Sequence, residues 1–125
     1  MFWYTIPMHK RKALIIAEEG EERQLAIELF EAFEVDTIVA NNFKHAQQAL
    51  KTGDITEVVT GSLHGKWRQV VTVTRRYAGD IPITLWTANP SYDREAKHIG
   101  VRFVNKESFD LLPLVVLSEG DRVPP

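Results

Sequence analysis

At 125 residues, with 44% hydrophobic content and 10% aromatic residues, the chain is long enough for one compact domain with a substantial core. The formal net charge of −2 gives no reason to expect binding to nucleic acid or to an anionic membrane surface. The sequence contains no cysteine, which excludes disulfides, thiolate metal sites and cysteine nucleophiles.

The first eight residues are apolar but do not read as a targeting signal. They lack a basic start, a long enough apolar core and a small-residue cleavage site. No apolar run reaches the roughly 18 residues of a membrane helix, so we expect no membrane partner and a cytoplasmic location.

We treat residues 1–11 as an N-terminal apolar extension. Its aromatic side chains should cover the domain or anchor an interface, so deleting residues 1–8 should lower stability or oligomeric state.

From residue 13 onward, short apolar runs alternate with longer amphipathic segments, which is typical of βαβ units on a parallel sheet. The predicted strands are 13–17, 35–40, 55–60, 81–87 and 101–104. The predicted helices are 25–33, 43–50, 66–77, 92–99 and 109–117. The clearest helix is the first, because Leu25, Ala26, Leu29, Phe30 and Phe33 fall at helical spacing. Two basic runs, 10–12 and 75–76, are interpreted as solvated surface.

The third predicted helix conflicts with local propensity. Residues 70–74 form a β-branched run that favours a strand. A helix is nevertheless predicted, because Trp67, Val70, Thr74 and Tyr77 can share one face and because a strand would break the alternation.

Ligands of open parallel sheets bind beyond the carboxyl ends of the strands, so the residues that follow each strand are candidates. These are Ala17, Glu18 and Glu19, then Thr60, Gly61 and Ser62, then Thr87 and Ala88, and finally Asn105 and Lys106. Carboxylates, hydroxyls and a lysine can bind a hydrated divalent cation and an anion. Polar residues at strand ends are also what any solvent-exposed edge would carry.

Three segments resemble a known family. They are Lys12–Glu19, Ile81–Ala88 and Gly100–Lys106, which are similar to the first, fourth and fifth strands of the receiver domain of two-component response regulators. The resemblance covers residues 12–117 and leaves 118–125 as a flexible tail. It implies a flavodoxin-like (CheY-like) three-layer α/β sandwich with five helices and a five-stranded parallel sheet of order 2-1-3-4-5.

When the family's residues are matched to this sequence position by position, the resemblance implies that Thr87 corresponds to the family's hydroxyl switch residue. Lys106 falls on the phosphate-contacting lysine, and Phe103 falls on the aromatic residue that changes rotamer on activation. These three positions agree with the family pattern.

The acidic positions depart from that pattern. Ala17 stands where the first metal-binding acid belongs, and Glu18 stands at the second. Thr60, or alternatively Gly61, stands where the family has its phosphoacceptor aspartate. Neither residue can form an acyl phosphate, so we expect no phosphotransfer, no enzymatic activity and no tight metal site, with Mg²⁺ binding weak at most.

The favoured function is therefore a pseudo-receiver, a regulatory module that binds a protein partner without phosphorylation. The partner is unidentified, and a homodimer is one option. The resemblance implies a partner surface at Tyr92, Arg94, His98, Arg102 and Phe103. The alternative is a small-anion or nucleotide-binding domain that uses the remnant pocket of Ala17, Glu18, Glu19, Thr60, Thr87 and Lys106.

A third reading is a small hydrolase with Ser62 and His64 as nucleophile and base. It lacks an orienting group and a Gly-x-Ser-x-Gly elbow, so it is the least favoured. The four histidines show no metal-ligand spacing, which argues against a zinc site.

Overall fold

The computed structural model describes residues 10–107 and 110–116. Most of the expected N-terminal extension and the whole of the expected tail lie outside these residues. Within the described part of the chain, no helix has both the length and the apolar character needed to cross a membrane.

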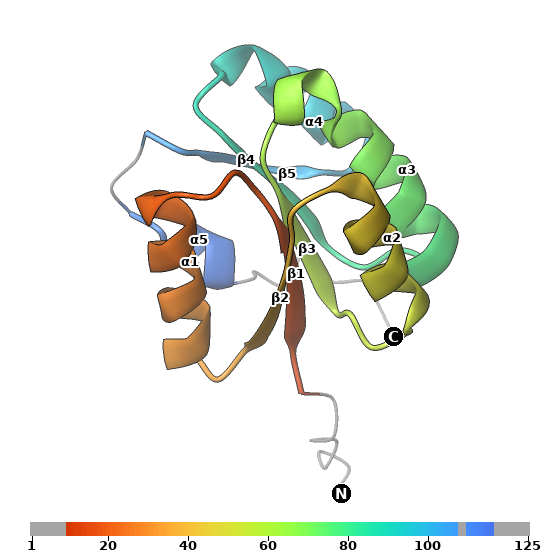
Figure 1. Ribbon diagram of the computed structural model, residues 1–125. Coiled ribbons are helices and arrows are strands. Elements are labelled where there is room, and N and C mark those ends of the chain that lie inside the picture. Colours follow the sequence, from red (N-terminus) through yellow and green to blue (C-terminus); the bar gives the residue numbers. More distant parts are fainter. Residues whose placement is uncertain (1–9, 108–109, 117–125) are drawn as a thin grey trace, which may run out of the picture.

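A five-stranded sheet forms the centre of the molecule (Figure 1). All four strand pairs are parallel, and the strand order is β2-β1-β3-β4-β5, as the resemblance implies. The strands are β1 (Lys12–Ile16), β2 (Asp36–Ala40), β3 (Glu57–Thr60), β4 (Ile83–Thr87) and β5 (Arg102–Asn105).

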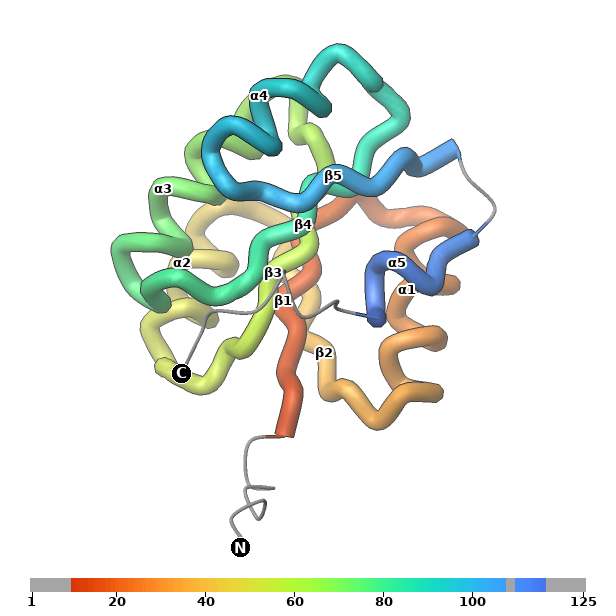
Figure 2. The backbone as a smooth tube through the Cα atoms, turned by 180° about the vertical axis from the view of Figure 1, so that it is seen from behind, coloured from red at the N-terminus to blue at the C-terminus, as the bar shows by residue number. Residues whose placement is uncertain are grey.

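Helices cover both faces of the sheet, which gives the three layers. In Figure 1, α1 and α5 lie on one side, while α2, α3 and α4 lie on the other; Figure 2 shows the same arrangement from behind. The helices are α1 (Glu21–Ala32), α2 (Phe43–Lys51), α3 (Trp67–Ala78), α4 (Asp93–His98) and α5 (Leu112–Val115), with 3-10 turns η2 (Leu63–Gly65) and η3 (Pro90–Tyr92).

The third helix forms as predicted, despite its β-branched sequence. Trp67, Val70, Val71 and Thr74 are buried on one face of α3. Burying this face against the sheet outweighs the weak local preference for a strand, because propensities are small compared with tertiary packing.

The core has two parts, one on each side of the sheet. Phe30 and Trp86 pack between the sheet and the α1 and α5 layer, whereas Leu14, Leu50 and Trp67 pack on the opposite side. The sheet is therefore covered on both faces, as continuous apolar strands require.

Two predicted helices differ from those observed. The apolar face of α1 is narrower than its sequence suggests, because Leu25 is 54% exposed and Phe33 is 46% exposed. The last helix begins at Leu112 rather than at residue 109, with Pro113 in its first turn. Proline is tolerated only in the first turn of a helix, which fixes this late start.

The basic run 10–12 is not plain solvated surface. Arg11 hydrogen-bonds both carboxylate oxygens of Glu57, at 2.8 and 2.6 Å, and Glu57 is only 3% exposed. Arg11 also donates to the carbonyl oxygen of Val115 at 2.6 Å. One arginine therefore ties the starts of β1 and β3 to the end of α5.

Candidate functional site

A small cavity lies at the carboxyl ends of β3 and β4, beside the loops that follow β1 and β5. Its volume is about 210 Å³. The described residues that line it are Glu18, Gly61, Ser62, Leu63, Trp86, Thr87, Ala88 and Lys106. The strand ends thus bring together Glu18, Thr87 and Lys106, three of the residues singled out in the sequence.

Thr60 and Gly61, the two candidates for the position of the family's phosphoacceptor aspartate, have different surroundings at the end of β3. Thr60 pairs with Ile16 in the sheet, is fully buried, and donates its hydroxyl to the carbonyl oxygen of Gly61 at 2.8 Å. Gly61 donates its backbone N–H to Ile16 at 2.8 Å and lines the cavity. Side chains alternate along a strand, so Gly61 occupies the position that faces the cavity.

Lys106 is held at the mouth of the cavity by three interactions. Its backbone N–H donates to Thr87 at 2.9 Å. Its ammonium lies 5.0 Å from the centre of the Trp86 ring and 3.4 Å from a carboxylate oxygen of Glu22. The Thr87 hydroxyl in turn accepts a hydrogen bond from the backbone N–H of Asn89 at 3.2 Å. The lysine charge is therefore already partly compensated.

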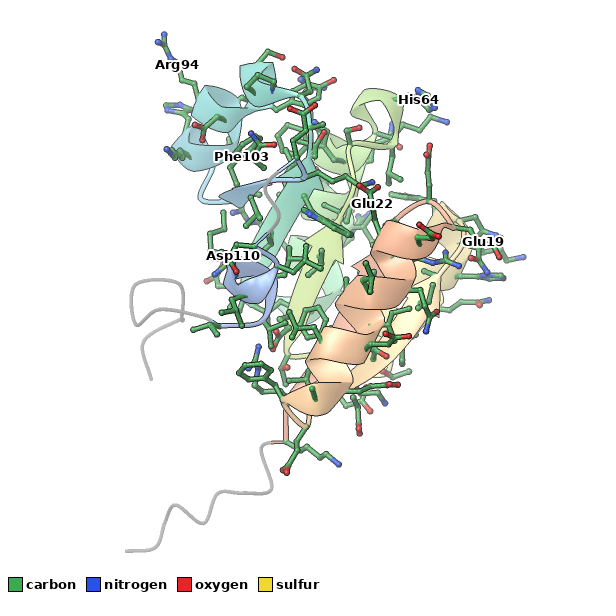
Figure 3. The ribbon with its side chains drawn as sticks, turned by 90° about the vertical axis from the view of Figure 1, so that its left-hand side faces the viewer. Glu19, Glu22, His64, Arg94, Phe103 and Asp110 are labelled. Atoms are coloured by element: carbon green, nitrogen blue, oxygen red, sulfur yellow. The ribbon has the colours of Figure 1, made fainter. Side chains whose placement is uncertain are left out.

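Glu22 was not among the sequence candidates. It lies in the first turn of α1, where an acidic residue suits the helix dipole, and this is a sufficient local reason for its presence. Figure 3 shows Glu22 near the start of α1, with His64 and Glu19 at the same end of the molecule. Glu19 is exposed and is not among the described residues that line the cavity.

Few carboxylates lie near the end of β1, where the resemblance expects metal-binding acids. Ala17 and Glu18 line a neighbouring hollow of about 300 Å³, and Glu18 lies 3.9 Å from His64 in an exposed pair. Among residues 10–107 and 110–116, no three His, Asp or Glu side chains lie close enough to share a metal ion. Glu18 alone supplies a carboxylate to the cavity, and Mg²⁺ needs several oxygen ligands.

The loop between β3 and α3 is backbone-strained. Leu63 and His64 have φ angles of 51° and 54°, and Gly65 follows at 88°. Two consecutive non-glycine residues in the left-handed region are unusual, and strained residues of this kind tend to cluster at functional sites. Ser62 and His64 form no hydrogen bond with each other in the described structure, so no serine–histidine pair is assembled there.

The five residues of the expected partner surface fall into two groups. Arg94 and His98 are exposed on α4, and Arg94 projects outward in Figure 3. Tyr92, Arg102 and Phe103 are half-buried. Arg102 donates to Thr84 at 3.2 Å, to Val116 at 3.2 Å, and also to the carbonyl oxygen of Pro113, so it fastens α5 to β5.

Tyr92 belongs to a cluster that sequence reasoning missed. Its ring meets Trp67 edge to face at 5.6 Å, and the guanidinium of Arg68 lies over both rings, at 5.0 and 5.3 Å. Arg68 also forms a two-bond pair with Glu95, at 2.5 and 2.6 Å. These hydrogen bonds lower the pKa of the Glu95 carboxyl and raise the pKa of Arg68. The cluster holds α4 against the start of α3.

The fold is shared with receiver domains of known structure. A response regulator receiver protein from Sinorhizobium medicae is 20% identical, with a TM-score of 0.71 over 86% of this chain and 90% of that chain. The response regulator TrrA from Thermotoga maritima, in complex with Mg²⁺ and BeF, is 20% identical, with a TM-score of 0.67 over 83% of this chain and 92% of that chain.

A third similar structure carries a different description. An adenylate cyclase from Rhodopirellula baltica is 17% identical, with a TM-score of 0.65 over 78% of this chain and 77% of that chain. No family profile and no curated protein matches the sequence. The structural likeness establishes a receiver-type fold, and the details of function must be argued from the residues of this chain.

Proposed function

We propose that this chain is a pseudo-receiver: a module with the receiver fold that binds a protein partner in the cytoplasm without being phosphorylated and without catalysing a reaction. The observation that carries the proposal is the residue at the cavity-facing end of β3. Gly61 stands there, at a position where the resemblance expects an aspartate. Without a carboxylate, no acyl phosphate can form at this position.

Neighbouring groups do not replace the missing nucleophile. The Thr60 hydroxyl is buried and hydrogen-bonded to the backbone, and the Glu18 carboxylate is exposed beside His64. Lys106 is paired with Glu22, which reduces its attraction for a phosphate group. The cavity therefore offers neither a nucleophile nor a strong cation site.

Partner binding is supported by the exposed surface of α4. Arg94 and His98 extend from a short helix that the Arg68–Glu95 pair fastens to α3. A rigid, exposed surface loses little conformational entropy on association, which favours binding without a phosphorylation-driven change of shape.

The test is affinity capture from lysate of the source organism, with quantitative mass spectrometry and no phosphodonor added. Arg94→Glu combined with His98→Glu should reduce recovery of the specific partner at least tenfold. Asp80→Lys, which reverses an exposed charge in the loop before β4, should leave recovery unchanged. A partner recovered equally by all three proteins would contradict the proposed surface, and one recovered only after phosphodonor treatment would contradict phosphorylation independence.

A small-anion site is the second candidate, because the cavity brings two hydroxyls and one lysine together. At about 210 Å³ the cavity is smaller than the roughly 300–1,000 Å³ of most ligand pockets, so it suits an inorganic anion better than a nucleotide. A rise in melting temperature with phosphate or sulfate that Lys106→Ala abolishes would support this candidate. The absence of any rise would dismiss it.

A further inference from the structure

The helix α1 and the helices α2 and α3, on opposite sides of the sheet, carry charges of opposite sign. Arg23 is the only basic residue between Glu18 and Asp36, a stretch that includes all of α1. By contrast, α2 and α3 contain no acidic residue at all. The helix α1 and the helices α2 and α3 cover opposite sides of the sheet (Figure 1). The molecule therefore has an acidic face and a basic face.

The acidic face is defined here by the exposed residues Glu21, Glu28, Glu31 and Glu34, and the basic face by the exposed residues Lys44, Lys51, Lys66, Arg75 and Arg76. Within the described part of the chain, none of these side chains has an ion-pair partner. The two faces are therefore available to neutralise charges on another molecule.

Three of these nine charges lie where they oppose the helix dipole, whereas Glu21, Lys51, Arg75 and Arg76 suit it. Glu31 is in the last turn of α1, which has no basic residue, and Lys44 is in the first turn of α2. Lys66 is the N-terminal cap residue of α3. Cations are unfavourable at helix N-termini and anions at C-termini, so these positions do not serve the stability of their own helices.

Each face also contains an apolar hollow. The hollow on the acidic face lies between α1 and α5, has a volume of about 460 Å³, and is bordered by Leu25 and Leu112, which are 54% and 46% exposed. The hollow on the basic face has a volume of about 300 Å³ and is lined by residues of α2 and α3 that include Phe43 and Val73. Apolar surface at the centre of a charged rim is the usual anatomy of a protein interface.

We propose that copies of this chain stack head to tail, with the acidic face of one copy on the basic face of the next. Such a contact uses two different surfaces, so it repeats into a ring or an open chain. A second copy fits better than an unrelated acidic ligand, which would contact only the basic face and leave Leu25 and Leu112 uncovered. The stacking faces do not include Arg94 or His98, so stacking and the proposed partner binding can fail separately.

The test is sedimentation velocity of the full chain over a range of protein concentrations. At about 0.01 M salt, where screening is weak, the average mass should rise with protein concentration; at about 1 M salt it should return toward the monomer. Wild-type protein that remains monomeric at low salt would overturn the proposal. A monomer that instead binds poly-glutamate through Lys44 and Arg76 would assign the basic face to a different partner, and would also overturn it.

Paired charge reversals make the test specific. Replacing Glu21, Glu28, Glu31 and Glu34 together by lysine gives a protein with two basic faces. Replacing Lys44, Lys51, Lys66 and Arg76 together by glutamate gives one with two acidic faces. Each variant alone should be monomeric, whereas an equimolar mixture should associate, because each basic face then meets an acidic one. Glu107→Lys, which reverses an exposed charge after β5 that belongs to neither stacking face, serves as the control and should stack like the wild type. Association that survives either reversal, or a mixture that stays monomeric, would overturn the stacking.

Discussion

Gly61 and Thr60 are neighbours at the end of β3, yet their side-chain positions have different surroundings. A Cβ at Gly61 would lie 3.8 Å from Ile16 and Ala17 and 3.9 Å from Trp86, which is ordinary van der Waals contact. A longer side chain at this position can continue into the cavity. At Thr60, by contrast, a larger polar group has no route to solvent, because this residue is fully buried.

An aspartate should therefore be tolerated at position 61 and not at position 60. Thr60→Asp should lower the free energy of unfolding by more than about 3 kcal/mol, because it buries a charge without a partner. Gly61→Asp should change it by less than about 1 kcal/mol. Urea unfolding measures both, with Thr60→Val and Gly61→Ala as the matched controls. A smaller loss for Thr60→Asp than for Gly61→Asp would show that Thr60 faces the cavity.

The sequence left Thr60 and Gly61 as alternatives for a physical reason. A shift of one residue moves a strand side chain to the opposite face of the sheet, and the end of an apolar run does not fix that phase. Thr87 and Lys106 were easier to place, because Thr87 ends β4 and Lys106 directly follows β5, and the carboxyl ends of parallel strands share one edge. The pairing of Lys106 with Glu22 depends on the residue at which α1 begins. The spacing of apolar residues in the sequence does not define that single residue.

At the scale of elements, α5 and α4 are both short, and each is fastened by an arginine from another element. Arg11 reaches the carbonyl oxygen of Val115 at the end of α5 while it pairs with buried Glu57. Arg68 joins α3 to α4 through Glu95. Helices of four and six residues are too short to be stable alone, so these contacts help to hold them in place.

Removing Arg11 should be costly, because it leaves a buried carboxylate without its cation. Arg11→Met should lower the free energy of unfolding by about 3 kcal/mol. Adding Glu57→Met should recover at least half of this loss, since no buried charge then remains unpaired. Chemical unfolding of the two variants and the wild type is the measurement. If the single variant were as stable as the wild type, the ion pair would have no structural role.

The Arg68–Glu95 pair should make stability depend on acidity. Hydrogen bonds from Arg68 hold the pKa of Glu95 below its ordinary value of 4.5. The ion pair therefore contributes fully to the free energy of unfolding above about pH 4.5, and this contribution is lost as the pH falls through the lower folded-state pKa of Glu95. Wild-type protein should be more stable than Glu95→Gln at about pH 7, and this difference should shrink at about pH 3. A difference that stays constant over this range would contradict the assignment.

At the scale of the whole molecule, the alternation of apolar and amphipathic segments was sufficient to predict five strands and five helices in the right order. The helix α3 was also predicted, because the spacing of Trp67 and Val70 indicates one helical face although the β-branched residues of this segment favour a strand. The exposure of Leu25 and Phe33 was not predictable, since helical spacing alone does not show how much of α1 the neighbouring α5 covers. The ion pair of Arg11 with Glu57 joins residues 46 positions apart and depends on strand register.

The molecule has a receiver-type fold, and at one end of the sheet it lacks carboxylates at positions where the resemblance expects them. Ala17 and Gly61 replace acids, while Thr87 and Lys106 remain beside the cavity. The proposed function follows from this combination: a receiver-type fold with no carboxylate at the cavity-facing end of β3.

Incubation with a small phosphodonor such as acetyl phosphate and Mg²⁺, followed by intact-protein mass spectrometry under conditions that preserve acyl phosphates, tests this account most directly. An authentic phosphorylatable receiver domain, treated in parallel, shows that the donor and the detection work. The account predicts no phosphoryl adduct on the full chain. Stoichiometric, Mg²⁺-dependent phosphorylation that maps to Glu18, Thr60 or any other residue around the cavity would contradict it.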